Sequence, residues 1–302
     1  MKYFPKKLTM TWIRNSYKEG SLTPEELAGE IVRRAEKYRD YNIWIVAPDL
    51  KRMMGYIEKL PKDMESLPLW GIPFAVKDNI DVAGSPTTAA CPDYAYDPKE
   101  DAAVVKKLIE AGAFPVGKTN LDQFATGLVG TRSPYGEVKN ALDPELISGG
   151  SSSGSAVSVA LGMAAFSLGT DTAGSGRVPA ALNCLVGYKP SLGAWSTKGV
   201  VPACASLDCV TVFANSLEDA EKVNLAARGV DEECCWSREY KEPLPKLPKK
   251  ICLAKDGVTF YGPYEDIYKA KWEQAKKRIE DMGITVEYID YTIVFKGSIH
   301  SL

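Results

Sequence analysis

The sequence predicts an α/β fold of three layers, whose sheet can be mixed. Helix and strand alternate twice. An amphipathic stretch that begins near Asp101 precedes an apolar run at 113–117, and a second such stretch at 271–282 precedes a run at 284–289. A glycine after each helical stretch, Gly112 or Gly283, marks its end. Repeated alternation of this kind favours helices packed on the faces of a sheet.

The N-terminal part of the chain predicts two helices. Thr23 and Glu26 form a capping-box pattern around Pro24, and apolar residues follow at helical spacing. This pattern predicts a helix over 24–38. A polar helical stretch follows at about 48–60.

Apolar runs predict the buried parts of the fold. GIPFAV at 71–76 is expected to be a buried strand, and its end delivers Lys77, Asp78 and Asn79. Asp101 is expected to cap the next helix, whose apolar stripe consists of Val104, Val105, Leu108 and Ile109. The segment 155–169 falls short of the roughly 20 apolar residues of a membrane span, so we expect buried core there. The Pro- and Lys-rich stretch 241–250 is typical of an exposed connector.

Composition argues against several classes of protein. The 37 Lys and Arg residues nearly balance the 39 Asp and Glu residues, without the basic excess of a nucleic-acid binder. One histidine, His300, disfavours a multi-histidine zinc site and leaves a conventional serine or cysteine hydrolase a single candidate base. Seven cysteines without CxxC spacing, and an N-terminus without the apolar run of a signal peptide, predict a cytoplasmic protein. We expect these cysteines to be small buried apolar side chains.

Glycine and serine are concentrated between 147 and 190, more densely than helix or strand propensity explains, so we expect something other than core packing to select them. Glycines let backbone N–H groups converge on an anion or a developing oxyanion, and serines supply nucleophiles or proton relays. The apolar segment 156–168 between the two serine clusters argues against a flexible linker, and the spacing of a phosphate loop is not met. The G-x-S-x-G nucleophile elbow is met by Gly150, Ser152 and Gly154, with His300 as its base, so an α/β-hydrolase stays open.

Longer blocks carry a more specific resemblance. GGSSSGS at 149–155 and GTDTAGSGRVPA at 169–180 closely resemble the amidase signature, and GIPFAVKDNIDVAG (71–84) and VGKTNLDQFATG (116–127) resemble further blocks of that family in the expected order. The resemblance covers about 10–220 and extends faintly to about 290. It implies the family's three-layer α/β/α sandwich around a mixed β-sheet. The expected single domain over 1–302 has an N-terminal helical region (1–65), a catalytic core (66–230), and a linker with a partial C-terminal lobe (241–302).

The resemblance also implies a catalytic triad of Lys77, Ser151 and Ser175. In that family the second residue follows a cis peptide bond and the third is the nucleophile. A lysine is a base only when neutral, and burial without a counter-ion lowers its pKa toward neutrality. We expect Lys77 to take a proton from Ser151, which relays one from Ser175 as it attacks an amide carbonyl. The implied oxyanion hole consists of the backbone N–H groups of Thr172, Ala173, Gly174 and Ser175.

Supporting roles are expected beside the triad. Asp171 and Arg177 flank the nucleophile and can pair to brace its loop. Ser152 either hydrogen-bonds to Lys77 or caps the backbone. The turn that resembles the family's substrate-facing loop consists of Ala125, Thr126 and Gly127. The carboxylate of Asp78 would raise the pKa of Lys77 unless it points away or is occupied by backbone donors.

Three segments, 86–96, 119–136 and 199–210, resemble the allophanate hydrolases within that family. They imply a hydrolase that needs no metal and no cofactor and cleaves a small-molecule amide, allophanate (urea-1-carboxylate), to ammonia and carbon dioxide in urea degradation. A functional link to a biotin-dependent urea carboxylase follows from this chemistry. A homodimer is one arrangement that remains open.

Two alternatives also remain open. One is a broader amidase or the amidase-like subunit of a transamidation complex, and the other is an inactive fragment that acts as a binding partner or has no role. The resemblance stops near Asp290, and no residue matches the tyrosine and arginine with which the family recognises the substrate carboxylate. If no other chain supplies the missing part, we expect an open pocket and an exposed sheet edge, and hence low stability and weak activity.

Overall fold

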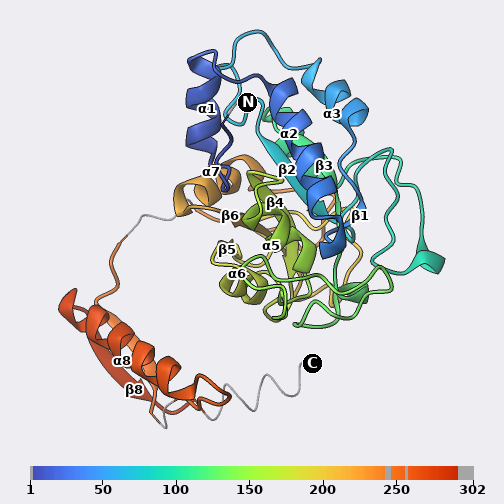
Figure 1. Cartoon of the computed structure of the whole chain (residues 1–302). Helices are drawn as coiled ribbons and strands as arrows, with labels where there is room; N and C mark the ends of the chain where they lie inside the picture. Colours follow the sequence, from blue (N-terminus) through green and yellow to red (C-terminus); the bar gives the residue numbers. More distant parts are fainter. Residues whose placement is uncertain (1–2, 242–245, 256–257, 292–302) are drawn as a thin grey trace. The chain divides into compact units, whose positions relative to one another are not determined.

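A computed structural model describes residues 3–241, 246–255 and 258–291 (Figure 1). The chain divides into two compact units, Met1–Tyr240 and Lys241–Leu302. The expected connector at 241–250 lies partly outside the described residues, and its described positions are exposed. His300, the base of the open α/β-hydrolase alternative, also lies outside them.

The first unit is built on a six-stranded mixed sheet, as predicted. The strand order is β1-β3-β2-β4-β6-β5. β2 runs parallel to β3 and β4, whereas the β1–β3, β4–β6 and β5–β6 pairs are antiparallel. The strands are β1 (Trp44–Val46), β2 (Pro73–Lys77), β3 (Phe114–Thr119), β4 (Phe166–Asp171), β5 (Val186–Tyr188) and β6 (Cys209–Ala214).

Helices cover this sheet (Figure 1). α5 packs on β2, β3, β4 and β6, while α4 and α7 pack on each other and on β3 and β6, respectively. The helices of the first unit are α1 (Met10–Lys18), α2 (Pro24–Lys37), α3 (Leu50–Ile57), α4 (Ala103–Glu110), α5 (Ser153–Ala160), α6 (Arg177–Leu182) and α7 (Leu217–Ala227). Short 3₁₀ turns lie at Arg39–Tyr41, Pro92–Tyr94 and Gln123–Ala125.

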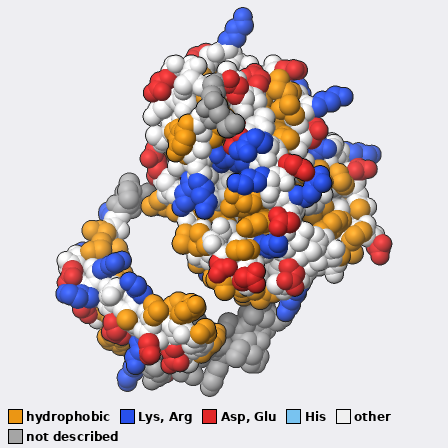
Figure 2. All heavy atoms as spheres, viewed as in Figure 1, with side chains coloured by type: hydrophobic (Ala, Val, Ile, Leu, Met, Phe, Trp, Pro, Cys, Tyr) orange, Lys and Arg blue, Asp and Glu red, His pale blue; other side chains and the backbone are white. Residues whose placement is uncertain are grey.

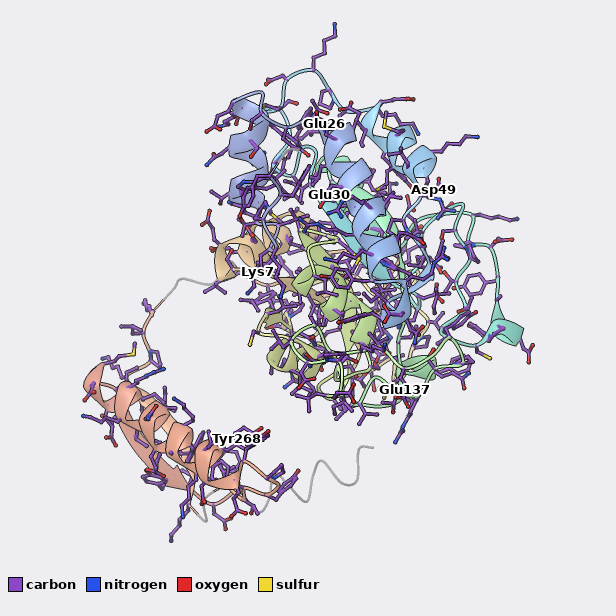
Figure 3. All side chains as sticks on the ribbon, in the orientation of Figure 1. Lys7, Glu26, Glu30, Asp49, Glu137 and Tyr268 are labelled. Carbon is purple, nitrogen blue, oxygen red and sulfur yellow. The ribbon has the colours of Figure 1, made fainter. Side chains whose placement is uncertain are left out.

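The helix starts show where local sequence signals suffice and where they do not. The capping box of α2 is confirmed, because Glu26 N donates to Thr23 Oγ1 at 3.3 Å and Thr23 N donates to Glu26 Oε2 at 3.0 Å. Asp49 caps α3, and Figure 3 labels both Glu26 and Asp49. The predicted cap of α4 by Asp101 is wrong. Ala102 is the N-cap, and Asp101 Oδ1 accepts a hydrogen bond from Ala83 N at 2.8 Å.

The core lies along the central strands, where every position of β2, β3, β4 and β6 is buried. Every residue of α5 is buried as well. A Cβ on Gly154 would lie 2.4 Å from the backbone oxygen of Ile43, and Ser155 Oγ donates to Leu168 O at 2.9 Å. Part of the glycine and serine density therefore serves close packing, which corrects the expectation that something other than packing selects these residues.

The second unit contains β7 (Lys250–Ala254), α8 (Glu265–Asp281) and β8 (Thr285–Ile289). β7 and β8 form a parallel pair in which Ile251 lies opposite Val286. The predicted helix and strand are both present, with α8 beginning six residues earlier than the sequence indicated. Tyr268, labelled in Figure 3, is an exposed residue of α8.

The surface and the cysteines were only partly predicted. Acidic and basic side chains are mixed on the visible face, in keeping with the balanced composition (Figure 2). All seven cysteines are free, but only Cys209 and Cys234 are buried, so the expectation of buried apolar cysteines is wrong for the other five. Within the described residues, no helix is long and apolar enough to cross a membrane.

Candidate active site

The C-terminal end of β2 places Lys77 in the interior of the first unit, with its side chain fully buried. Its Nζ donates to Ser151 Oγ at 2.8 Å and to Thr170 Oγ1 at 2.7 Å. Within the described part of the chain, no carboxylate oxygen lies within ion-pair distance of Nζ. Burial lowers the pKa of Lys77 to about 7, against the opposing influence of Asp122, Asp208 and Asp171.

The neighbouring carboxylate, Asp78, is occupied elsewhere. Its Oδ2 accepts hydrogen bonds from the backbone N–H, at 2.9 Å, and the hydroxyl of Thr88. Its Oδ1 lies 3.1 Å from Nζ of Lys118, another buried lysine. The expectation that backbone donors occupy Asp78 is confirmed. Its ion pair with Lys118 was missed, although VGKTN places that lysine at the end of a predicted strand.

Ser151 lies just before α5, and the peptide bond between Gly150 and Ser151 is cis. The backbone of this loop is tied to the loop after β3, because Asp122 N donates to Ser151 O at 3.0 Å. A Cβ on Gly150 would lie 2.0 Å from Asp122 Oδ2, so the position requires glycine. The carboxylate of Asp122 also accepts N–H groups from Gly130, at 3.1 Å, and Arg132, at 2.9 Å.

Ser175 lies between β4 and α6, in a loop organised by Asp171. Asp171 accepts the backbone N–H groups of Gly174, Gly176 and Arg177, and the Arg177 side chain binds both carboxylate oxygens at 2.9 Å. Burial raises the pKa of Asp171, but the hydrogen bonds from Arg177, Gly174 and Gly176 outweigh burial and lower it. Asp171 and Arg177 thus form the predicted brace of the nucleophile loop.

The candidate oxyanion hole differs from the prediction at one position. The N–H group of Gly174 donates to Asp171 Oδ1 at 2.7 Å, so Gly174 is not a free oxyanion donor. Its φ of +134° instead makes it the residue that turns the loop. In the described part of the chain, the N–H groups of Thr172, Ala173 and Ser175 have no protein acceptor.

The Ser175 hydroxyl donates to Gly127 O at 3.4 Å rather than to Ser151. The two serine loops nevertheless adjoin, because Ser152 N donates to Ser175 O at 3.4 Å. One link of the predicted relay, Lys77 to Ser151, is therefore formed. The link from Ser151 to Ser175 requires the Ser175 side chain to turn from Gly127 toward Ser151.

Ser152 contacts the backbone and not the lysine. Its Oγ donates to Thr170 O at 3.1 Å and accepts from Thr170 N at 3.3 Å. Of the two predicted roles, the hydrogen bond to Lys77 is therefore not formed, because both contacts of the Ser152 hydroxyl are with Thr170. Ser152 is also fully buried, whereas the serine of a nucleophile elbow must be exposed to substrate, which argues against the α/β-hydrolase alternative.

The turn at Ala125, Thr126 and Gly127 lies beside the nucleophile. Ala125 has a positive φ of 56°, and Gly127 O accepts the hydrogen bond from Ser175. Arg132 Nη1 donates to Thr126 O at 3.5 Å. A hollow of about 430 Å³ opens here, lined by Gln123, Thr126, Arg132, Ser133 and Pro134.

Sequence reasoning missed residues that support the triad. Thr170 Oγ1 contacts Lys77 and also accepts from Asn79 Nδ2 at 3.4 Å. Asp208 accepts the Thr172 hydroxyl and the N–H group of Ala203 at 3.0 Å. All lie in motifs already identified, but their side-chain partners are distant in sequence. Among the described residues, no group of three or more His, Cys, Asp or Glu side chains could hold a metal ion.

Comparisons with known proteins agree with this geometry. The Amidase family matches residues 26–294. Urea amidolyase of Saccharomyces cerevisiae is 48% identical over 255 residues, which is 83% of this chain and 14% of that protein. One chain of the glutamyl-tRNA(Gln) amidotransferase of Methanosarcina mazei is 36% identical over 290 residues, which is 94% of this chain and 60% of that protein.

Solved structures show the same relationship. Allophanate hydrolase of Kluyveromyces lactis matches with a TM-score of 0.83 and 43% identity, over 94% of this chain and 47% of that chain. This chain thus spans less than half of that structure and about one seventh of the yeast urea amidolyase. The family match over most of the chain and the likeness to these relatives show that the chain belongs to the Amidase family.

Proposed function

We propose that this chain is an amidohydrolase that acts on a linear amide C–N bond through Lys77, Ser151 and Ser175, with allophanate as its substrate. One observation carries the chemistry. A fully buried lysine with hydroxyl partners and a pKa of about 7 is neutral in half of the molecules at neutral pH, so it can serve as a base there.

The reaction begins when the Ser175 hydroxyl turns toward Ser151. Ser151 gives its proton to neutral Lys77 and receives the proton of Ser175, whose oxygen forms a bond to the amide carbonyl carbon. The N–H groups of Thr172, Ala173 and Ser175 are the donors that can stabilise the oxyanion, each typically worth a factor on the order of 10²–10³ in rate.

Collapse of the tetrahedral intermediate breaks the C–N bond. The proton held by Lys77 returns through Ser151 to the leaving nitrogen, which departs as ammonia and leaves an acyl group on Ser175. A water molecule then attacks the acyl group with the same base, and the nucleophile is regenerated. Proton and electron pairs balance over both steps without a cofactor.

Support for allophanate comes from the relatives named urea amidolyase and allophanate hydrolase. The same names support the proposed link to a biotin-dependent urea carboxylase that supplies the substrate. The free cysteines support the proposed cytoplasmic location. The match to a glutamyl-tRNA(Gln) amidotransferase keeps transamidation as a second candidate, at lower identity.

The test is ammonia release by the purified chain from allophanate and, separately, from glutamine, with Ser175→Ala as the blank. Release from allophanate that is lost in Ser175→Ala supports the proposal. Release from glutamine alone would favour the transamidation candidate. A folded chain that releases ammonia from neither substrate would contradict both candidates.

A further inference from the structure

Lys77 Nζ lies between two hydroxyl groups. Ser151 Oγ is 2.8 Å away and Thr170 Oγ1 is 2.7 Å away, and both side chains are buried. A neutral amine has two N–H groups and one lone pair, whereas each hydroxyl can donate or accept. Either hydroxyl could therefore donate to the lone pair of Lys77. Only donation by Ser151 leads to the proposed proton relay.

Asn79 distinguishes the two hydroxyl groups. Its Nδ2 is held by Val201 O at 3.0 Å and also donates to Thr170 Oγ1 at 3.4 Å. Thr170 Oγ1 thus faces two donors, Lys77 and Asn79, which occupy both acceptor positions of a hydroxyl oxygen. Its own proton is then directed away from Lys77. The backbone of Thr170 is fixed as well, because Ser152 Oγ binds both its N–H and its C=O group.

We propose that Thr170, oriented by Asn79, is a positioning residue for the lysine base: it accepts one N–H group of neutral Lys77 and so leaves the lone pair to Ser151. This inference rests on the proposed function and adds a residue outside the triad. Thr170 acts through Lys77 and touches no reacting atom itself.

The positioning role predicts a particular pH dependence. A hydroxyl acceptor stabilises a charged ammonium more than a neutral amine, so removal of the Thr170 hydroxyl lowers the pKa of Lys77 further. The charged groups that influence Lys77 are Asp122 after β3, Asp171 at the end of β4 and Asp208 before β6, and they are unchanged by a substitution at Thr170. The activity should therefore fall while its acid limb moves to lower pH.

The experiment compares Thr170→Val, which removes the hydroxyl at similar volume, with Thr170→Ser, which keeps it. Two rates are measured as functions of pH: kcat/KM for ammonia release from allophanate, and labelling of Ser175 by a fluorophosphonate probe. Thr211→Val is the matched control. Thr211 is a fully buried threonine on the neighbouring strand β6, and its hydroxyl has no hydrogen-bond partner in the described part of the chain.

We expect Thr170→Val to lower both rates on the order of 10²-fold, as for a misplaced catalytic group, and to move the acid limb down by roughly one pH unit. Thr170→Ser should recover most of the rate, and Thr211→Val should match the wild type. An unmoved acid limb in folded Thr170→Val, or a Thr170→Ser variant as slow as Thr170→Val, would overturn the positioning role.

A thermal melt of each variant separates loss of fold from loss of position. If Thr170→Val does not fold, Asn79→Leu asks the same question, because it frees the Thr170 hydroxyl to compete for the Lys77 lone pair. That variant should also be slower with its acid limb at lower pH, and an unchanged profile would refute the proposal. A wild-type chain that is inactive on allophanate and unlabelled at Ser175 would instead refute the proposed function.

Discussion

The buried charge state of Lys77 makes a quantitative prediction about stability. We consider Lys77→Met, which keeps a long side chain and removes the titratable group. The pKa of Lys77 falls from 10.5 to about 7 on folding, so between these pH values the unfolded chain binds one more proton than the folded chain. Stability of the wild type then rises with pH over this window by up to about 1.4 kcal/mol per pH unit.

The sign and size of the effect follow from linkage. Below pH 7 the lysine is charged in both states, and the folded state carries the full penalty of a buried charge, about 5 kcal/mol. Above pH 10.5 it is neutral in both states and the penalty is gone. The free energy of unfolding of Lys77→Met minus that of the wild type should therefore decrease by about 2 kcal/mol between pH 7 and pH 9.

The assay is urea denaturation of both proteins at several pH values, with equal slopes against urea as the check on two-state behaviour. Other titrating groups are common to both proteins and cancel in the difference. Lys118→Met is the control, because it leaves Asp78 buried without its ion-pair partner and should be destabilised by about 3–5 kcal/mol. A Lys77 difference that stays constant from pH 7 to pH 9 would refute the reasoning.

Three further predictions concern the loops around the triad. Gly150→Ala should destabilise the chain by about 1–3 kcal/mol in chemical denaturation, since its Cβ would lie 2.0 Å from Asp122 Oδ2, whereas Gly29→Ala on α2, with nothing within 4 Å, should be neutral or stabilising; equal effects would contradict the packing argument. Arg177→Gln should cost about 1 kcal/mol at pH 7, because the arginine is half exposed. The pKa of Asp171 is lowered in the folded state, so this difference should shrink as the pH falls below 3.8, and a constant or growing difference would count against the brace. Ser152→Ala should still be labelled by the serine-directed probe, whereas labelling lost in this variant and kept in Ser175→Ala would reverse the assignment of the nucleophile.

Local sequence signals predicted the parts of the fold whose causes are local. The capping box at Thr23 and Glu26 placed the start of α2, and the abrupt end of GIPFAV placed Lys77 at the end of a buried strand. Asp101 shows the limit of such signals. It has the right residue type for a cap, but it accepts the N–H group of Ala83, which a local pattern cannot reveal.

What the sequence determined by itself is the set of chemical groups and their order along the chain: a lysine after a strand, two serine-rich loops and a pattern that resembles a known family. The tertiary structure decided which groups meet. Lys77 contacts Thr170, 93 residues away, and Asp78 pairs with Lys118 from the adjacent strand, so that one buried lysine keeps a counter-ion and the other does not. It also directed the Gly174 N–H group to Asp171. The physical reason is that the pKa of a buried group and the partner of a hydrogen-bond donor depend on distances of a few ångströms, which arise only when strands and loops far apart in the sequence pack together.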